Sequence, residues 1–71
     1  MAELLTTTMK LERARRDLTQ AELADLAGVT RKSINAIETG HMVPSIVLAL
    51  KLAHALGVKV EDLFALEVVP D

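Results

Sequence analysis

The chain has 71 residues, a net charge of −2, no cysteine and a single aromatic residue, although 51% of its residues are hydrophobic. These features exclude a disulfide scaffold, a thiolate metal site and a thiol nucleophile, and they fit a reducing cytoplasm. No apolar run approaches the ~18 residues of a membrane span, and the start MAELLTTTMK lacks the regions of a signal peptide. We therefore expect one domain, residues 1–71, of closely packed small helices with no membrane partner.

Residues typical of helix N-termini predict five short helices. The first runs from about Met9 to Arg16, with Thr8 as its N-cap. Thr19 and Glu22 form a capping box, T-x-x-E, that opens the second helix at about residue 20.

The third, fourth and fifth helices are also predicted from residues near their ends. Thr30 caps the third helix and Ser45, directly after a proline, caps the fourth. A glycine, which adopts the left-handed conformation of a helix C-terminus without penalty, follows the second, third and fourth helices: Gly28, Gly40 and Gly57. A short fifth helix is expected near Val60 to Phe64, although Lys59 is a poor cap.

The terminal segments, residues 1–8 and 65–71, lie outside these helices. Their runs LLTTTM and LEVV are rich in β-branched or aliphatic residues and have no helical period. They are either frayed termini or short antiparallel strands that pair at a dimer interface, which would use apolar surface that a monomer leaves exposed.

Apolar periodicity indicates which helix faces are buried. The second helix carries an apolar stripe made of Leu23, Ala24, Leu26 and Ala27. Ile34 and Ile37 form the stripe of the third helix, with Val29 entering ahead of them. The fourth helix is apolar nearly all round, with only Lys51 and His54 to mark an outer face. We therefore expect the fourth helix to be the central element.

Residues 20–39 are predicted to form a helix-turn-helix unit, because two short helices meet at a tight turn through Gly28. With the two isoleucines of the third helix inward, its opposite face presents Arg31, Lys32, Asn35 and Ala36. A B-DNA major groove admits one α-helix, and arginine or lysine can donate to guanine O6 and N7. Residues 28–51 carry three lysine or arginine side chains against Glu38 alone, whereas the end of the chain is acidic. The middle of the chain is thus expected to bind a polyanion.

The segment LTQAELADLAGVTRKSINAIETGHMVPS, continued by LALKLAHALGVKVEDLF, resembles the DNA-binding domain of the Cro/C1-type (xenobiotic-response-element-like) helix-turn-helix regulators. The resemblance covers roughly Met9 to Phe64. It implies an all-α, five-helix domain like that of lambda repressor, usually a homodimer, that binds double-stranded DNA at near-palindromic operators.

The resemblance also implies roles for individual residues. Gln20 would contact a phosphate and brace the third helix, and Thr30 would meet a phosphate where that helix begins. The base-facing residues would be Arg31, Lys32 and Asn35, with Ser33 at the margin. The loop and the next helix start would hold the DNA backbone through Gly40, His41 and Ser45. Arg13 and Glu38 would pair and tie the first helix to the third.

Three positions depart from the pattern that is common in this family. Lys32 stands where many relatives have glutamine, Met42 stands where tyrosine is common, and His41 replaces a lysine or arginine. The base preference of a relative is therefore not transferable, and the loop is expected to hold the DNA backbone less strongly.

Other titratable side chains have structural explanations. His41 and His54 lie on different elements without a carboxylate or cysteine at ligand spacing, so no metal site is expected. Glu61 and Asp62 lie at a helix start, where negative charge is favourable. The chain shows no nucleophile–base pair and no phosphate-binding glycine loop. Neither an enzyme, a cofactor nor a small-molecule ligand is therefore expected.

The sequence thus predicts a cytoplasmic, sequence-specific transcriptional regulator, most simply a dimeric repressor that occludes a promoter. Its two recognition helices would enter successive major grooves about 10 base pairs apart. Two alternatives remain open from the sequence. One is an antitoxin or protein-interaction adaptor of helix-turn-helix type, and the other is the detached DNA-binding domain of a larger regulator.

Overall fold

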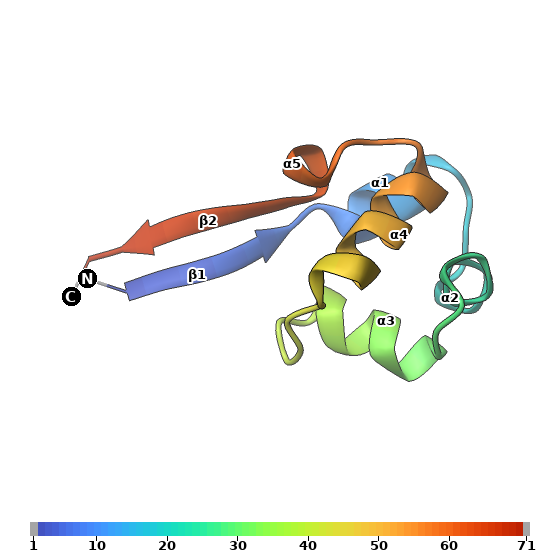
Figure 1. The fold of residues 1–71 in the computed structure, drawn as a ribbon, viewed down its shortest axis with the longest axis horizontal. Coiled ribbons are helices and arrows are strands. Elements are labelled where there is room, and N and C mark those ends of the chain that lie inside the picture. Colours follow the sequence, from blue (N-terminus) through green and yellow to red (C-terminus); the bar gives the residue numbers. More distant parts are fainter. Residues whose placement is uncertain (1, 71) are drawn as a thin grey trace.

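The computed structural model describes residues 2–70, which form five helices and a two-stranded antiparallel ribbon that projects from the helical body (Figure 1). The elements in chain order are β1 (Ala2–Thr7), α1 (Met9–Arg15), α2 (Gln20–Ala27), α3 (Arg31–Glu38), α4 (Ile46–Leu56), α5 (Val60–Leu63) and β2 (Phe64–Val69). The expected all-α class therefore describes the body correctly but omits the two strands.

The predicted caps of α2, α3 and α4 are confirmed. The backbone N–H of Glu22 donates to Thr19 Oγ1 over 3.0 Å, and the N–H of Thr19 donates to the Glu22 carboxylate over 2.9 Å. The second bond is the main reason that the pKa of Glu22 lies below its ordinary value, and the Thr19 side chain contributes to the same shift. Thr30 and Ser45 each accept from the N–H three residues further on, over 3.1 Å. Short-range signals thus fix where the three helices begin.

The start of α1 differs from the prediction. Thr8 occupies the N-cap position, but its side chain does not cap the helix. Its hydroxyl donates instead to the carbonyl of Asp62 over 2.8 Å, and its N–H donates to the carbonyl of Leu63 over 3.0 Å. Thr8 therefore ties the start of α1 to α5. Phe64, expected at the end of the fifth helix, is already extended and begins β2.

A core of aliphatic side chains holds the helices together. Ile34 and Ile37 of α3 are buried as predicted, and the buried cluster also contains Met9, Leu23, Ala24, Ala27, Leu48, Leu52, Ala53, Leu56 and Leu63. Met9, the first residue of α1, has no exposed surface. Its long, flexible side chain fills the centre of a body that has almost no aromatic volume.

One expectation about burial is wrong. Leu26, assigned to the buried stripe of α2, is 61% exposed. The fourth helix contributes five buried residues to the core, and Ile46, Val47 and Leu50 are exposed on its outer side. The apolar residues of α4 thus exceed what its inner stripe requires, since that stripe alone contacts the core.

The two terminal strands pair with each other inside one chain. Ala2 lies opposite Val69, and Thr7 lies opposite Phe64, in an unbroken antiparallel register. The strands therefore exist, but this ladder joins the two ends of one molecule and does not cross between two molecules. Figure 1 shows the ribbon reaching away from the helical body.

Replacing Gly57 by alanine is expected to lower the free energy of unfolding by about 1 kcal/mol, which is about 4–8 °C in Tm for a domain of this size. Gly57 ends α4 with φ +68°, and an added Cβ would meet no atom within 4 Å, so only the left-handed backbone is penalised. Thermal unfolding followed by circular dichroism measures the change. Gly57→Asn is the control, because asparagine tolerates this conformation better; equal losses for both variants would contradict the explanation.

Candidate nucleic-acid interface

The geometry of the α2–α3 unit determines which side of α3 faces outward. Gly28 ends α2 in the left-handed conformation, and the N–H of Val29 then donates to the carbonyl of Ala24 over 3.0 Å. The chain therefore reverses within a few residues, and Ile34 and Ile37 anchor α3 against the core. The opposite face of α3 is left to the solvent.

The structure brings together four of the side chains that the sequence assigned to DNA binding. Arg31, Lys32 and Asn35 are exposed on α3, and together with Gln20 of α2 they line one shallow, open hollow. Ser33 and Ala36 lie at the margins of this face and are half-buried. We call these six residues the α3 face. The four polar side chains that line the hollow, together with the small Ala36, suit close approach to a polar groove.

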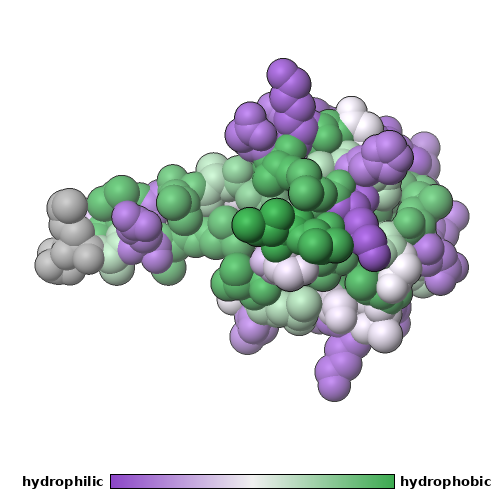
Figure 2. All heavy atoms as spheres, viewed as in Figure 1, coloured by the Kyte–Doolittle hydropathy of each residue, from purple (hydrophilic) through white to green (hydrophobic). Residues whose placement is uncertain are grey.

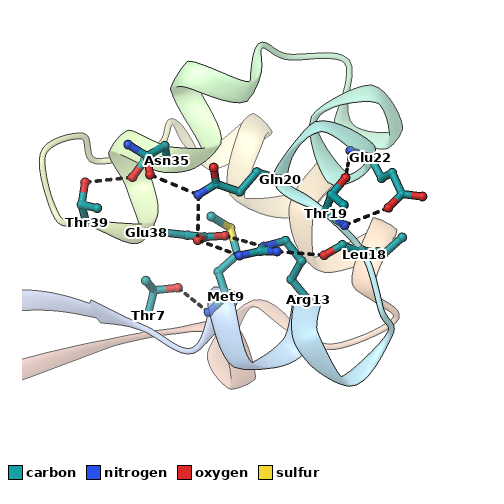
Figure 3. A network of polar contacts seen from close by, with 10 residues as sticks. All are labelled: Thr7, Met9, Arg13, Leu18, Thr19, Gln20, Glu22, Asn35, Glu38 and Thr39. Carbon is teal, nitrogen blue, oxygen red and sulfur yellow. Dashed lines mark hydrogen bonds and ion pairs between the residues drawn. The ribbon is translucent and has the colours of Figure 1, made fainter.

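Gln20 fixes the position of Asn35 on this face. Its Nε2 group donates to Asn35 Oδ1 and to Glu38 Oε1, each over 3.1 Å (Figure 3). A side-chain amide has two N–H hydrogens, and both are used here. In this arrangement the Gln20 side chain braces α3 as expected, but it has no hydrogen left to donate to a phosphate.

An ion pair beneath the α3 face joins α1 to α3. Arg13 Nε donates to Glu38 Oε2 over 2.9 Å, and Arg13 Nη2 donates to Glu38 Oε1 over 3.2 Å. A third bond runs from Arg13 Nη1 to the carbonyl of Leu18 over 2.8 Å. The side chain of Glu38 is 4% exposed and that of Arg13 is 16% exposed. The carboxylate nearest to the α3 face is thus buried and neutralised, so the face keeps the positive charge of its arginine and lysine.

Thr39, which the sequence analysis did not single out, connects α3 to the following loop. Its Oγ1 donates to the backbone carbonyl of Asn35 over 2.8 Å and lies 2.8 Å from His41 Nδ1. The N–H of His41 also donates to the carbonyl of Ala36 over 2.8 Å. Gly40 and His41 are exposed on this loop. The available signal was a threonine in the last turn of a helix, where its hydroxyl can bond the carbonyl four residues earlier.

Thr30 and Ser45 lie at the first turns of α3 and α4, both exposed. Their oxygens accept the capping N–H groups, and the Thr30 hydroxyl also lies 3.1 Å from Ser33 Oγ. Backbone N–H groups at a helix start have no partner within the helix and favour anions. His54 lies on α4, apart from His41, and residues 2–70 hold no group of three side chains that would bind a metal ion. No helix in this range is both long enough and apolar enough to cross a membrane.

Comparison with known proteins agrees with this geometry. A family model described as helix-turn-helix matches residues 9–63. The uncharacterized HTH-type transcriptional regulator YgzD of Bacillus subtilis is 49% identical over 55 residues, which are 78% of this chain and 83% of YgzD. A second uncharacterized HTH-type transcriptional regulator, from Methanocaldococcus jannaschii, is 49% identical over 59 residues, which are 83% of this chain and 89% of that protein.

The fold is also similar to a solved structure. The restriction-modification controller protein C.AhdI from Aeromonas hydrophila superposes with a TM-score of 0.73 and 33% sequence identity, covering 76% of this chain and 82% of C.AhdI.

Replacing Arg13 by methionine is expected to lower the free energy of unfolding by about 3 kcal/mol, because Glu38 would keep a buried charge without its cationic partner. The double variant Arg13→Met/Glu38→Leu is expected to regain part of this loss, since no unpaired charge remains. Urea unfolding of the parent chain, both single variants and the double variant measures the coupling. Simple addition of the two single losses would show that the pair does not stabilise the fold.

Proposed function

Because the chain belongs to the helix-turn-helix family of DNA-binding transcriptional regulators, we propose that it is a dimeric repressor whose α3 helices read a near-palindromic operator. It is accordingly not an enzyme. The observation that carries the proposal is the α3 face, on which Arg31, Lys32 and Asn35 are exposed while the adjacent Glu38 is buried in its ion pair. The face is positive although the chain carries a net charge of −2.

Base recognition is assigned to the exposed side chains of α3. Arg31 and Lys32 are donors without acceptor capacity, so guanine O6 and N7 are their natural partners in the major groove. The small Ala36 lets the helix backbone approach the groove, and Ser33 contacts its edge. Discrimination between sequences therefore rests on two donors and the fixed amide of Asn35.

Asn35 is restricted in what it can recognise. A bidentate contact to adenine requires both the oxygen and the nitrogen of the amide. Gln20 donates to one of the two lone pairs of Asn35 Oδ1, which fixes the plane of the amide and leaves one lone pair and the hydrogens of Nδ2 for a base. We assign Asn35 to a purine, whose N7 accepts from Nδ2.

Phosphate contacts are assigned to the helix starts and to the loop after α3. The backbone N–H of Gln20 begins α2, and the starts of α3 and α4 carry Thr30 and Ser45. Gly40 and His41 add a short exposed loop. Contacts of this kind position the protein and make binding depend on salt, without carrying sequence information.

The regulatory consequence follows from where such a dimer lies. Two α3 helices in successive major grooves would each lie about half a turn of DNA from the operator centre, and the bound dimer would exclude polymerase from an overlapping promoter. We place this regulator in the cytoplasm, as the sequence predicts. The similarity to C.AhdI, a restriction-modification controller protein, supports a regulatory role.

Replacing Arg31 by alanine is expected to relax base preference at one position of each half-site and to cost about 1–3 kcal/mol in operator binding. The measurement is selection from a randomised duplex pool at two salt concentrations, followed by sequencing of the bound DNA. The parent chain should enrich a palindrome with half-sites one helical turn apart. No enrichment at either salt concentration would overturn the proposed function, and an equal loss on all sequences would make Arg31 a phosphate contact.

Replacing Gln20 by leucine is expected to weaken base preference at the position that Asn35 reads, because the hydrogen bond that fixes the plane of the Asn35 amide is lost. Preferences at the other positions should stay unchanged. The same selection measures this loss, and Asn35→Ala, which should abolish preference at that position, is the matched control. An unchanged preference in Gln20→Leu would show that the hydrogen bond does not orient Asn35.

A further inference from the structure

We propose that His41 binds a DNA phosphate through Nε2 only when its ring is protonated, and that Thr39 is the residue that positions the ring. DNA affinity then rises as the pH falls through the range in which histidine gains its charge, which lies between pH 5 and 8 for an ordinary histidine. The inference rests on the proposed function and adds to it the atom that contacts the phosphate and the condition that regulates this contact.

The loop that carries His41 is tied to the turn of α3 that carries the α3 face. The N–H of His41 donates to the carbonyl of Ala36 over 2.8 Å, and the N–H of Gly40 donates to the carbonyl of Ile37 over 3.2 Å. Ala36 belongs to the α3 face, whereas Ile37 is fixed in the core. The exposed His41 therefore keeps a set position relative to the α3 face, as a phosphate contact that fixes the register on DNA requires.

The hydrogen bonds of Thr39 determine which nitrogen of the ring carries a hydrogen. A threonine hydroxyl has one hydrogen to donate and two lone pairs with which to accept. Thr39 Oγ1 donates this hydrogen to the carbonyl of Asn35 over 2.8 Å (Figure 3). The 2.8 Å contact between Thr39 Oγ1 and His41 Nδ1 therefore takes its hydrogen from the ring. We assign the hydrogen of the neutral ring to Nδ1, which leaves a lone pair on Nε2.

The charge of the ring decides whether Nε2 can bind a phosphate. The neutral ring offers only the lone pair at Nε2, and phosphate oxygens are acceptors as well, so no hydrogen bond forms between them. The protonated ring has a hydrogen on both nitrogens, and Nε2 then donates a charge-assisted bond to phosphate. The bond from Nδ1 to Thr39 is the same in both forms. Protonation thus changes the atom that meets the DNA without rearranging the loop.

The charged side chains around the loop leave the phosphate contact to His41. Within residues 2–70, the elements next to the loop carry these charged residues: Arg31, Lys32 and Glu38 on α3, Lys51 on α4, and Glu3 and Glu67 on the ribbon. Glu38 is paired with Arg13, and its side chain is 4% exposed. The two cations of α3 lie in its first turn, whereas the loop follows its last turn. Residues 39–45 contain no second basic side chain, so protonated His41 is the cation of this loop.

The ribbon carboxylate that faces the loop is Glu3. It lines a groove together with Gly40 and Met42, the neighbours of His41 in the chain. Where the ribbon meets the body, Figure 2 shows mainly hydrophobic residues. A carboxylate beside the loop attracts a protonated ring but repels a phosphate, so the experiment includes a variant that removes the charge of Glu3.

The test is DNA affinity at about pH 5.5 and about pH 8, measured at constant ionic strength by fluorescence anisotropy on a labelled duplex of mixed sequence. A phosphate contact acts on every sequence, so the operator need not be known. The parent chain should bind at least ~10-fold more tightly at the lower pH, since a hydrogen bond to a charged group is gained. The plot of log affinity against log salt should also steepen by about 0.9 per chain, as one more phosphate is neutralised.

Variants of the loop separate the charge of His41 from the positioning role of Thr39. His41→Gln should lose the gain at low pH, and His41→Lys should bind at both pH values about as tightly as the parent chain at the lower one. Thr39→Val should lose most of the gain, whereas Thr39→Ser, which keeps the hydroxyl, should retain it. His54→Gln is the matched control, because His54 is exposed on α4 and lines a different hollow. Glu3→Gln should also retain the gain.

The hydrogen on Nδ1 can be tested without DNA. Proton–nitrogen correlation spectra of the histidine rings at about pH 8 should show the hydrogen of His41 on Nδ1 in the parent chain. A hydrogen on Nε2 would overturn the positioning role of Thr39. Circular dichroism checks that each variant is folded.

The outcomes separate this inference from the proposed function. Equal affinity of the parent chain at both pH values overturns the inference, and so does a gain that persists in His41→Gln or disappears in Glu3→Gln or His54→Gln. An enriched operator that is bound without pH dependence overturns the inference alone. The expected gain on mixed-sequence DNA without enrichment of any sequence would instead refute the proposed function and leave the inference standing. A chain that binds no duplex at either pH overturns both.

Discussion

The bond between Arg13 and Glu38 is the interaction on which the rest of the DNA-facing surface depends. Glu38 is almost fully buried, and its two oxygens receive Arg13 from α1 and Gln20 from α2. Gln20 then reaches Asn35 on the exposed side of α3. Three helices are thus connected through one carboxylate, and the recognition helix is positioned by charge-assisted bonds as well as by apolar packing.

Burying this carboxylate also resolves an electrostatic conflict. The chain has more acidic than basic residues, yet DNA carries dense negative charge. Pairing Glu38 with Arg13 removes the acidic charge nearest to Arg31 and Lys32 from the surface. The two exposed cations therefore act on DNA without a competing carboxylate on the same helix. The net charge of the chain and its ability to bind DNA are therefore set independently. The charge of the surface that contacts DNA determines how α3 approaches the DNA more than the net charge of the chain does.

Local signals made much of the body predictable. Caps and C-terminal glycines depend on residues within one turn, so the starts of α2, α3 and α4 could be predicted to the residue. Burial on α4 could not be predicted to the residue, because whether Val47 or Leu50 is covered depends on which elements pack against that side of the helix. The strands had the right composition, but the pairing of Ala2 with Val69 is a contact between the two ends of the chain. The role of Thr8 was misassigned for the same reason, since its partner Asp62 is 54 residues away.

Several exposed apolar residues lie together on the outer side of α4, and their exposure has a physical reason. Local rules assume that an apolar residue is covered by its own chain, so they fail where another molecule provides the cover. Ile46, Val47 and Leu50 are apolar residues of this kind, exposed on the outer side of α4. If a second copy covers them, dimerisation stabilises the fold by mass action, and the ribbon, the dimer and operator binding become linked equilibria. Occupancy of a palindromic operator would then rise more steeply than linearly with the concentration of the chain, because each bound unit contains two copies.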